Sequence, residues 1–260
     1  MSGCHSKWEN SPEHEKSCGR CANCANGHVH AHDQNTERNK HPGSESRSSV
    51  SSDGNEIPAA RNRFYFESKN IVAINLLGAS GAGKTSLLEN TITALSGEIC
   101  FSVIETDRHS NYDTKRIEET EARVISLRTG DGCQLFSQMI NDALKILKPE
   151  NNSVLFIENL AAPLCPTLHD VGEQKRVVIL SVTEGEEKPL VYPEMYKTAD
   201  LCLISKSDLL PYVDIDLEYL KANIRKVNND LRCIILSCRL NEGMNEWYDW
   251  IRAISKMKKK

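Results

Sequence analysis

The stretch Gly78-Ala79-Ser80-Gly81-Ala82-Gly83-Lys84-Thr85 decides the fold that the sequence predicts. It fits G-x-x-x-x-G-K-[ST] and lies between the apolar run 71–77 and the helix-forming residues 86–88, the context of a phosphate-binding loop. In such a loop backbone N–H groups surround phosphates, Lys84 reaches the β- and γ-phosphates, and the Thr85 hydroxyl binds Mg²⁺. A glycine-rich turn that matches by chance is the alternative. The expected nucleotide-binding residues are Gly78, Ser80, Gly81, Ala82, Gly83, Lys84, Thr85 and Ser86.

After Arg61, short apolar runs alternate with longer mixed segments, a pattern typical of strands separated by helices. This order predicts an α/β fold with a mostly parallel central sheet and helices on both faces. Ligands of such sheets bind beyond the carboxyl ends of the strands, where the phosphate loop would lie. We expect strands at 71–77, 99–104, 123–127, 153–158, 176–182, 199–205 and 231–236, and helices at 84–95, 133–147, 216–228 and 243–256.

Residues 1–60 differ in composition from the rest of the chain. They contain only three aliphatic residues of the Val, Leu or Ile type and many Ser, Asn, His and charged residues, so they cannot bury enough apolar surface to fold alone. We expect a disordered tail and linker over 1–60 and one domain over 61–260. The net charge of −4 gives no reason to expect nucleic-acid binding. Because no apolar run is typical of a membrane span or a signal peptide, we expect a cytoplasmic protein.

The tail is rich in residues that bind metals. It holds four of the ten cysteines and six of the eight histidines of the chain. Three evenly spaced thiols are followed by alternating histidines, which lets a flexible backbone wrap thiolates and an imidazole around one cation. Nickel, zinc and copper all accept such ligands, and a solvated tail with incidental thiols, or a remnant of cloning, is the alternative. The expected ligands are Cys18, Cys21, Cys24, His28, His30 and His32.

Two predicted strands end in acidic residues on the side of the phosphate loop. The second ends in Glu105-Thr106-Asp107 and the fourth in Glu158-Asn159. Carboxylates at this edge are suited to hold Mg²⁺ beside the γ-phosphate, directly or through water. We therefore expect Asp107 and Glu158 to act with Lys84 and Thr85. Acids that only cap loops are the alternative.

The run Ser205-Lys206-Ser207-Asp208 follows a predicted strand and resembles the N-K-x-D sequence with which GTPases read guanine. The Asp208 carboxylate can accept hydrogen bonds from guanine N1 and N2, and the Lys206 stem can lie along the base. Serine in place of asparagine removes one hydrogen bond, which costs about 1 kcal/mol unless the serine replaces it. Ser237-Cys238-Arg239 is a weaker match to a further loop under the base.

Six cysteines lie outside the tail, and two of them stand at predicted strand ends on the nucleotide side. Cys133 and Cys165 are expected to form a second, softer metal site or to be small buried residues, and the residues alone leave both interpretations open. Cys100, Cys202 and Cys233 lie within strand patterns and are expected in the core. His169 follows Cys165 closely and is an isolated histidine, for which a surface or loop role is the simpler interpretation.

The chain resembles the HypB family of hydrogenase nickel-incorporation GTPases, which are dimerising P-loop GTPases of the SIMIBI class. The resemblance spans residues 71–251 and is strongest in the run SVTEGEEKPL at 181–190. The other motifs that carry it are the phosphate loop 78–85, Glu105-Thr106-Asp107, the run 129–133, Ile157-Glu158-Asn159, Cys165-Pro166, the run 170–173, Tyr192-Pro193, and the runs 208–212 and 242–247.

The resemblance implies a function and a set of partners. GTP hydrolysis would gate nickel delivery to the large subunit of [NiFe]-hydrogenase, together with a zinc-containing partner similar to HypA. A homodimer would form across the nucleotide face, with Cys133 and Cys165 supplying a shared nickel or zinc site. The chain departs from the family pattern at Gln134, where a histidine ligand is usual, at Ser205, at the run 160–163, and in the C-x-x-C-x-x-C spacing of its tail.

We therefore expect a GTPase that uses GTP, Mg²⁺, Ni²⁺ and Zn²⁺. Hydrolysis should be slow, because no glutamine or arginine of the motifs is placed to position the attacking water. A metallochaperone GTPase that serves urease is one alternative, which the run 181–190 argues against. A nickel or zinc storage and sensing protein with a weak nucleotide site is another, which the intact Lys84 and Thr85 argue against.

Overall fold

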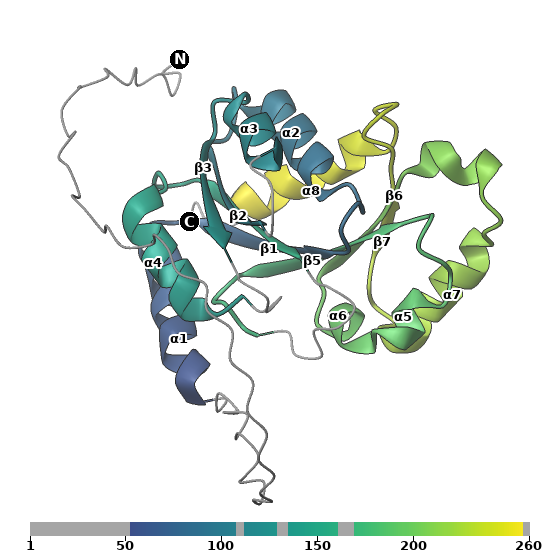
Figure 1. The fold of residues 1–260 in the computed structure, drawn as a ribbon, viewed down its shortest axis with the longest axis horizontal. Helices are drawn as coiled ribbons and strands as arrows, with labels where there is room; N and C mark the ends of the chain where they lie inside the picture. Colours follow the sequence, from purple (N-terminus) through teal and green to yellow (C-terminus); the bar gives the residue numbers. More distant parts are fainter. Residues whose placement is uncertain (1–52, 108–111, 129–134, 161–168, 257–260) are drawn as a thin grey trace, which may run out of the picture. The chain divides into compact units, whose positions relative to one another are not determined.

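The computed structural model describes residues 53–107, 112–128, 135–160 and 169–256, and Figure 1 shows their arrangement. The tail segment 1–52, with its predicted metal ligands, lies outside these described residues. So do Cys133, Gln134 and Cys165. The fold below is that of the described part of the chain.

Strands and helices alternate along this part of the chain. The strands are β1 (Val72–Gly78), β2 (Phe101–Asp107), β3 (Arg123–Arg128), β4 (Val154–Leu160), β5 (Lys175–Ser181), β6 (Leu201–Ser205) and β7 (Cys233–Ile235). The helices are α1 (Asp53–Ser68), α2 (Lys84–Leu95), α3 (Tyr112–Glu118), α4 (Ser137–Leu147), α5 (Lys188–Val191), α6 (Pro193–Lys197), the 3-10 helix η1 (Ser207–Tyr212), α7 (Leu217–Val227) and α8 (Met244–Lys256).

The strands form one seven-stranded sheet in the order β3-β2-β4-β1-β5-β6-β7. Each neighbouring pair runs parallel. The central strand β1 pairs with β4 on one side and β5 on the other, so the loop after Gly78 leaves from the middle of the sheet. The predicted parallel α/β sheet is confirmed, and the chain order of its strands reverses at β1, the position at which such sheets bind ligands.

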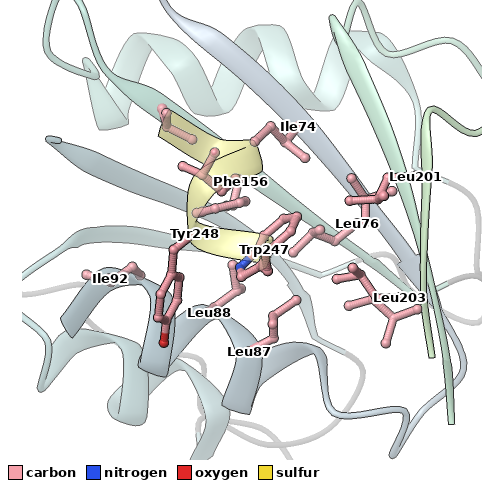
Figure 2. Close-up of a cluster of buried hydrophobic side chains, with 14 of the residues drawn as sticks. Ile74, Leu76, Leu87, Leu88, Ile92, Phe156, Leu201, Leu203, Trp247 and Tyr248 are labelled. Carbon is pink, nitrogen blue, oxygen red and sulfur yellow. The ribbon is translucent and has the colours of Figure 1, made fainter. Parts of the chain in front are cut away.

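Alternation along β1 divides its side chains between two apolar layers. Ile74 and Leu76 belong to a cluster with α2 and α8, whereas Ala73 and Leu77 belong to clusters with α1, α4, α6 and α7. Helices therefore cover both faces, as Figure 1 shows. Figure 2 shows the first cluster around Trp247, whose indole N–H donates to Thr91 Oγ1 at 2.8 Å. Trp247 is the largest of the fully buried side chains, and this bond gives its only polar group, the indole N–H, a hydrogen-bond partner.

The helix α1 begins at Asp53, within the segment expected to be linker. Of its buried residues, Ala59 is not one of the aliphatic types counted in that segment, and Asn62 and Phe66 lie beyond the segment. The short helices α3, α5, α6 and η1 were not predicted either, because four to seven residues are too few to show a helical period. No helix in the described ranges is long and apolar enough to cross a lipid bilayer.

Candidate nucleotide and metal site

The predicted phosphate loop connects β1 to α2. Gly83 precedes the helix with φ +98°, a left-handed conformation that side chains rarely adopt, which explains a glycine at this position. Lys84 is buried, and its Nζ donates to the carbonyl oxygens of Gly78 at 3.1 Å and Ala79 at 2.9 Å. The ammonium group is thus held within the curve of the loop, at the positive end of α2.

Glu158 brings a carboxyl group from β4 to this loop. Its Oε1 accepts a hydrogen bond from Thr85 Oγ1 at 3.3 Å, and its Oε2 is buried with no hydrogen-bond partner in the described part of the chain. On β2, Thr106 Oγ1 donates to the backbone oxygen of Glu158 at 2.9 Å, which fixes the two strand ends together. Glu158, which the sequence predicts as a magnesium residue, thus lies beside Thr85, and its role stays a prediction. An orphaned carboxylate oxygen next to a threonine hydroxyl fits a hard cation.

Burial raises the pKa of Glu158 to about 7, and the nearby charges of Glu105 and Asp113 act in the same direction. Lys84 and the hydrogen bond from Thr85 oppose this shift. Burial also lowers the pKa of Lys84, while Glu158 and Asp113 raise it. The site therefore gathers one buried ammonium group and three carboxyl groups, an arrangement in which a bound cation would favour the ionised form of Glu158.

Asp113 is a residue of this site that the sequence did not predict. It lies at the start of α3, which is joined to β2 by a hydrogen bond from Thr114 Oγ1 to Glu105 Oε2 at 2.5 Å. Asp107 was predicted as a magnesium residue, and the structure describes only its backbone, at the end of β2. Its role stays a prediction.

The predicted guanine loop is joined to the phosphate loop. Ser205 is buried at the end of β6, and its Oγ donates to the backbone oxygen of Ala82 at 2.6 Å. The sequence predicted that serine in place of asparagine would lose one hydrogen bond unless the serine replaced it. The bond from Ser205 to Ala82 is such a replacement. Lys206, the next residue, has a left-handed backbone with φ +61°.

Asp208 is oriented by the loop after β7. Ser237 Oγ donates to Asp208 Oδ1 at 2.6 Å and accepts from the Leu240 amide at 3.2 Å. Arg239 lies 4.0 Å from the second oxygen, Oδ2. The residues 237–239, a weak match in sequence, therefore lie next to the predicted guanine loop. Ser237 fixes one oxygen of the Asp208 carboxylate, which would bind the base.

A second lysine lies near Lys84. Lys188, at the start of α5, forms an ion pair with Glu184, and burial followed by the charge of Lys84 lowers its pKa. The other oxygen of Glu184 accepts from the Ser181 amide at 2.7 Å, so the turn after β5 is fixed. The run 181–190 thus brings a further cation toward the phosphate loop. Sequence reasoning gave Lys188 no role, because its approach depends on the fold of this turn.

The residues that flank the two predicted inner metal ligands meet. Phe136 closely follows Cys133 and His169 closely follows Cys165, and their ring centroids are 4.9 Å apart. The Nε2 atom of His169 is buried and has no hydrogen-bond partner in the described ranges. Within those ranges no three His, Cys, Asp or Glu side chains gather into a metal site.

Comparison with known protein families identifies residues 72–234 as a match to the model of the CobW/HypB/UreG nucleotide-binding domain. The hydrogenase maturation factor HypB of Rhizobium leguminosarum bv. viciae is 45% identical over 199 residues, which cover 76% of this chain and 67% of that protein. The chain spans about two thirds of the length of the relatives that it matches at 44 to 45% identity, with coverage of 65 to 67%.

Two solved structures share the fold. The hydrogenase maturation factor HypB from Archaeoglobus fulgidus superposes with a TM-score of 0.72 at 34% identity, covering 77% of this chain and 98% of that one. HypB from Helicobacter pylori, in complex with nickel, superposes with the same TM-score of 0.72 at 27% identity, covering 78% and 95%.

Proposed function

The chain belongs to the CobW/HypB/UreG family of nucleotide-binding domains and groups within it with the HypB proteins, and from this premise we propose that it is a GTP-hydrolysing nickel metallochaperone for [NiFe]-hydrogenase maturation. The observation that carries the nucleotide part is the bond between the two loops, Ser205 Oγ to Ala82 O at 2.6 Å. It joins a phosphate loop to a loop that presents Asp208. One ligand with phosphates and a guanine base matches both loops.

The roles proposed for the site residues follow from their positions. Lys84 neutralises charge on the β- and γ-phosphates, while Thr85 and Glu158, with Asp107, hold Mg²⁺ directly or through water. Magnesium commonly keeps several waters and takes one or two carboxylates, so the pair of Glu158 and Thr85 is a sufficient anchor. Lys206 and Asp208 bind the base. Hydrolysis would be slow, because the motifs offer no glutamine or arginine to position the attacking water.

Replacing Lys84 tests the phosphate site. We expect Lys84→Ala to lower the rate of GTP hydrolysis by at least about 100-fold, because it removes the cation that faces the transferred phosphoryl group. Phosphate release would be measured at saturating GTP. Lys197→Ala, which removes an exposed lysine paired with Glu194 on α6, is the matched control and should leave the rate unchanged. Hydrolysis by Lys84→Ala at the control rate would contradict the assignment.

Nickel is proposed to bind at two places. The tail ligands are Cys18, Cys21, Cys24, His28, His30 and His32, as the sequence predicts. The inner site is formed by Cys133 and Cys165, and the contact between Phe136 and His169 supports an approach of the two segments. His169, whose Nε2 has no partner among described residues, is a source for the imidazole that Gln134 lacks. Zinc is the second cation that such a ligand set accepts.

The partners also remain proposals. They are a HypA-like zinc-containing chaperone, the hydrogenase large subunit, and a second copy of this chain that would meet the first across the nucleotide face. The cytoplasmic location expected from the sequence stays a prediction. Delivery requires that nickel affinity depend on the nucleotide, since otherwise hydrolysis could not drive release.

A nickel titration tests the proposed function. The full chain is used because α1 begins at Asp53, so truncation at residue 61 would cut this helix. The three predicted cysteine ligands of the tail are replaced by serine and its three predicted histidine ligands by alanine, and nickel affinity is measured with GDP and with a non-hydrolysable GTP analogue. Affinity that differs between the nucleotides supports a nucleotide-gated inner site. Equal affinity contradicts gated delivery, and no binding would favour a storage protein whose tail is the carrier.

His169→Ala is made in the same chain, in which the predicted tail ligands are already replaced. It tests whether the imidazole of His169 binds nickel in addition to the thiols. If His169 is a ligand, nickel affinity falls at least about 10-fold, as for the loss of one metal ligand or its support. Met139→Ala, on the nearby helix α4, is the control for general loosening of this region.

A further inference from the structure

Two free cysteines lie side by side in the sheet, away from the proposed metal ligands. Cys202 on β6 is paired in register with Cys233 on β7, and both are reduced thiols. Each thiol is the strongest influence on the pKa of the other, and Cys233 Sγ lies 3.8 Å from Leu231 O. The sequence predicted both as core residues, and the structure makes them neighbours although 31 positions separate them in the chain.

The two thiols have different environments. Cys202 is fully buried, and the neighbouring Cys233 thiol and burial raise its pKa. Cys233 is partly exposed, and the Cys202 thiol together with the charges of Arg225 and Lys221 on α7 lowers its pKa, against an opposing effect of burial. Attack on an oxidant needs a thiolate that solvent can reach, and of the two thiols Cys233 is the more exposed and the one whose surroundings favour the thiolate.

A polar group without a partner lies at the same place. The Tyr196 hydroxyl on α6 is buried with no hydrogen-bond partner in the described residues, and both thiols act on its pKa, which burial raises most. An orphaned buried hydroxyl is unfavourable, so such groups call for a specific explanation. A cysteine that serves only to pack the core does not need a second thiol, neighbouring cations or an unpartnered hydroxyl beside it. This pair has all three.

We propose that Cys202 and Cys233 are a redox-active dithiol that a peroxide oxidises to an intramolecular disulfide. The Cys233 thiolate attacks one peroxide oxygen, the O–O bond breaks, and hydroxide leaves as Cys233 becomes a sulfenic acid. Cys202 sulfur then attacks the Cys233 sulfur and loses its proton, and the sulfenic oxygen leaves as water. In total two thiols and one hydrogen peroxide give one disulfide and two waters. The unpartnered Tyr196 hydroxyl would donate to the sulfenic oxygen between the two steps.

The sheet geometry permits this bond. Neighbouring strands lie about 4.7 to 4.9 Å apart, and residues directly paired in a parallel sheet have Cα atoms at about that distance. Disulfides span Cα separations of about 4.4 to 6.8 Å. Closure of the bond therefore requires side-chain rotation and little movement of β6 or β7. The inference does not depend on the nucleotide or nickel functions proposed above.

Peptide mass spectrometry of the full reduced chain tests the proposal. The protein is treated with hydrogen peroxide, its remaining thiols are alkylated, and it is digested without reduction. We expect a linked peptide that contains Cys202 and Cys233, with loss of alkylation at both. If both stay alkylatable while other cysteines of the same sample are oxidised, the proposal is wrong. A linked peptide that forms only after unfolding in denaturant would also overturn it.

Three variants assign the roles. In Cys202→Ser the linked peptide is lost and a sulfenic acid at Cys233 becomes trappable by dimedone, because the second thiol is absent. Cys238→Ser removes the other free cysteine of the described residues and should keep the linked peptide. Tyr196→Phe should slow disulfide formation without preventing it. The measurement on the wild-type chain tests the proposal without any variant, so the test remains valid even if a variant fails to fold. Circular dichroism checks the fold of each variant.

Discussion

Glu158 is a buried carboxyl group whose surroundings favour the protonated form. Its pKa is raised from the ordinary value of 4.5 to about 7, mainly by burial. The folded chain therefore holds this proton more tightly than the unfolded chain does. It follows that the contribution of Glu158 to the free energy of unfolding is most favourable below pH 4.5 and falls as the pH rises toward 7. The total change is about 3 kcal/mol.

Replacing Glu158 with glutamine should remove this pH dependence. In magnesium-free and nucleotide-free protein, we expect Glu158→Gln to be more stable than wild type at pH 8, and the difference to shrink as the pH falls to 5. Urea denaturation at several pH values measures it. Asp142→Asn, at an exposed position of α4, is the control: the pKa of this carboxyl is lowered from its ordinary value, so it stays ionised between pH 5 and 8 and its effect on stability should be constant over that range. A constant difference between Glu158→Gln and wild type would contradict the raised pKa.

Ser205 shows how one atom can connect two loops. Its hydroxyl bonds to Ala82 O of the phosphate loop, so Ser205→Ala leaves a buried carbonyl without this donor. We expect the affinity for GDP to fall about 5-fold, the equivalent of about 1 kcal/mol. Isothermal titration measures this change. Ser207→Ala, two residues further along the same loop, serves as the control. Unchanged affinity in Ser205→Ala would mean that the bond does not support nucleotide binding.

At the scale of elements, α1 is held by a side chain from its middle. Asn62 donates to the backbone oxygens of Ser137 at 2.8 Å and Val171 at 3.0 Å, and Asn141 donates to its Oδ1 at 3.1 Å. Gly172 lies against the same helix with φ +90°, and a Cβ atom there would meet Ala59 O at 2.6 Å. The motif at 170–173 is thus a docking point for α1, the helix that leads into β1.

Asn62→Ala should loosen this docking point. Two buried carbonyl oxygens and the part-buried amide of Asn141 lose this partner, so we expect the free energy of unfolding to fall by about 3 kcal/mol. Chemical denaturation gives the value. Arg61→Ala changes the neighbouring exposed position of the same helix and should shift stability by less than about 0.5 kcal/mol. Equal stability of both variants would show that α1 is not held by these bonds.

At the scale of the whole molecule, the tail and the folded part are proposed to work separately. Deleting residues 1–32 removes the six predicted tail ligands and leaves α1 intact, since α1 begins at Asp53. We expect the deletion to lower the number of nickel ions bound per chain while the affinity for GDP stays the same. Atomic absorption after equilibrium dialysis gives the first quantity and calorimetry the second. Unchanged nickel content would contradict the tail assignment.

The sequence by itself determined the features that local patterns encode. Apolar periods predicted all seven strands and the four longest helices after α1, and the phosphate motif predicted the loop between β1 and α2, because strand, loop and helix are contiguous there. The position of Glu158 was predicted for a related reason. The carboxyl ends of parallel strands all lie at the same edge of the sheet, and the phosphate loop leaves from that edge. The family was also recognisable from contiguous motifs.

Only the tertiary structure decided which distant side chains meet. Asp113 reaches Lys84 through a helix too short to show a period, and Ser237 reaches Asp208 from another strand. Asn62 anchors α1, a helix whose first half lies in the segment expected to be linker. Cys202 and Cys233 become a pair only through the register of β6 and β7. These contacts depend on packing between segments that the chain does not connect locally, and single-sequence patterns carry no information about it.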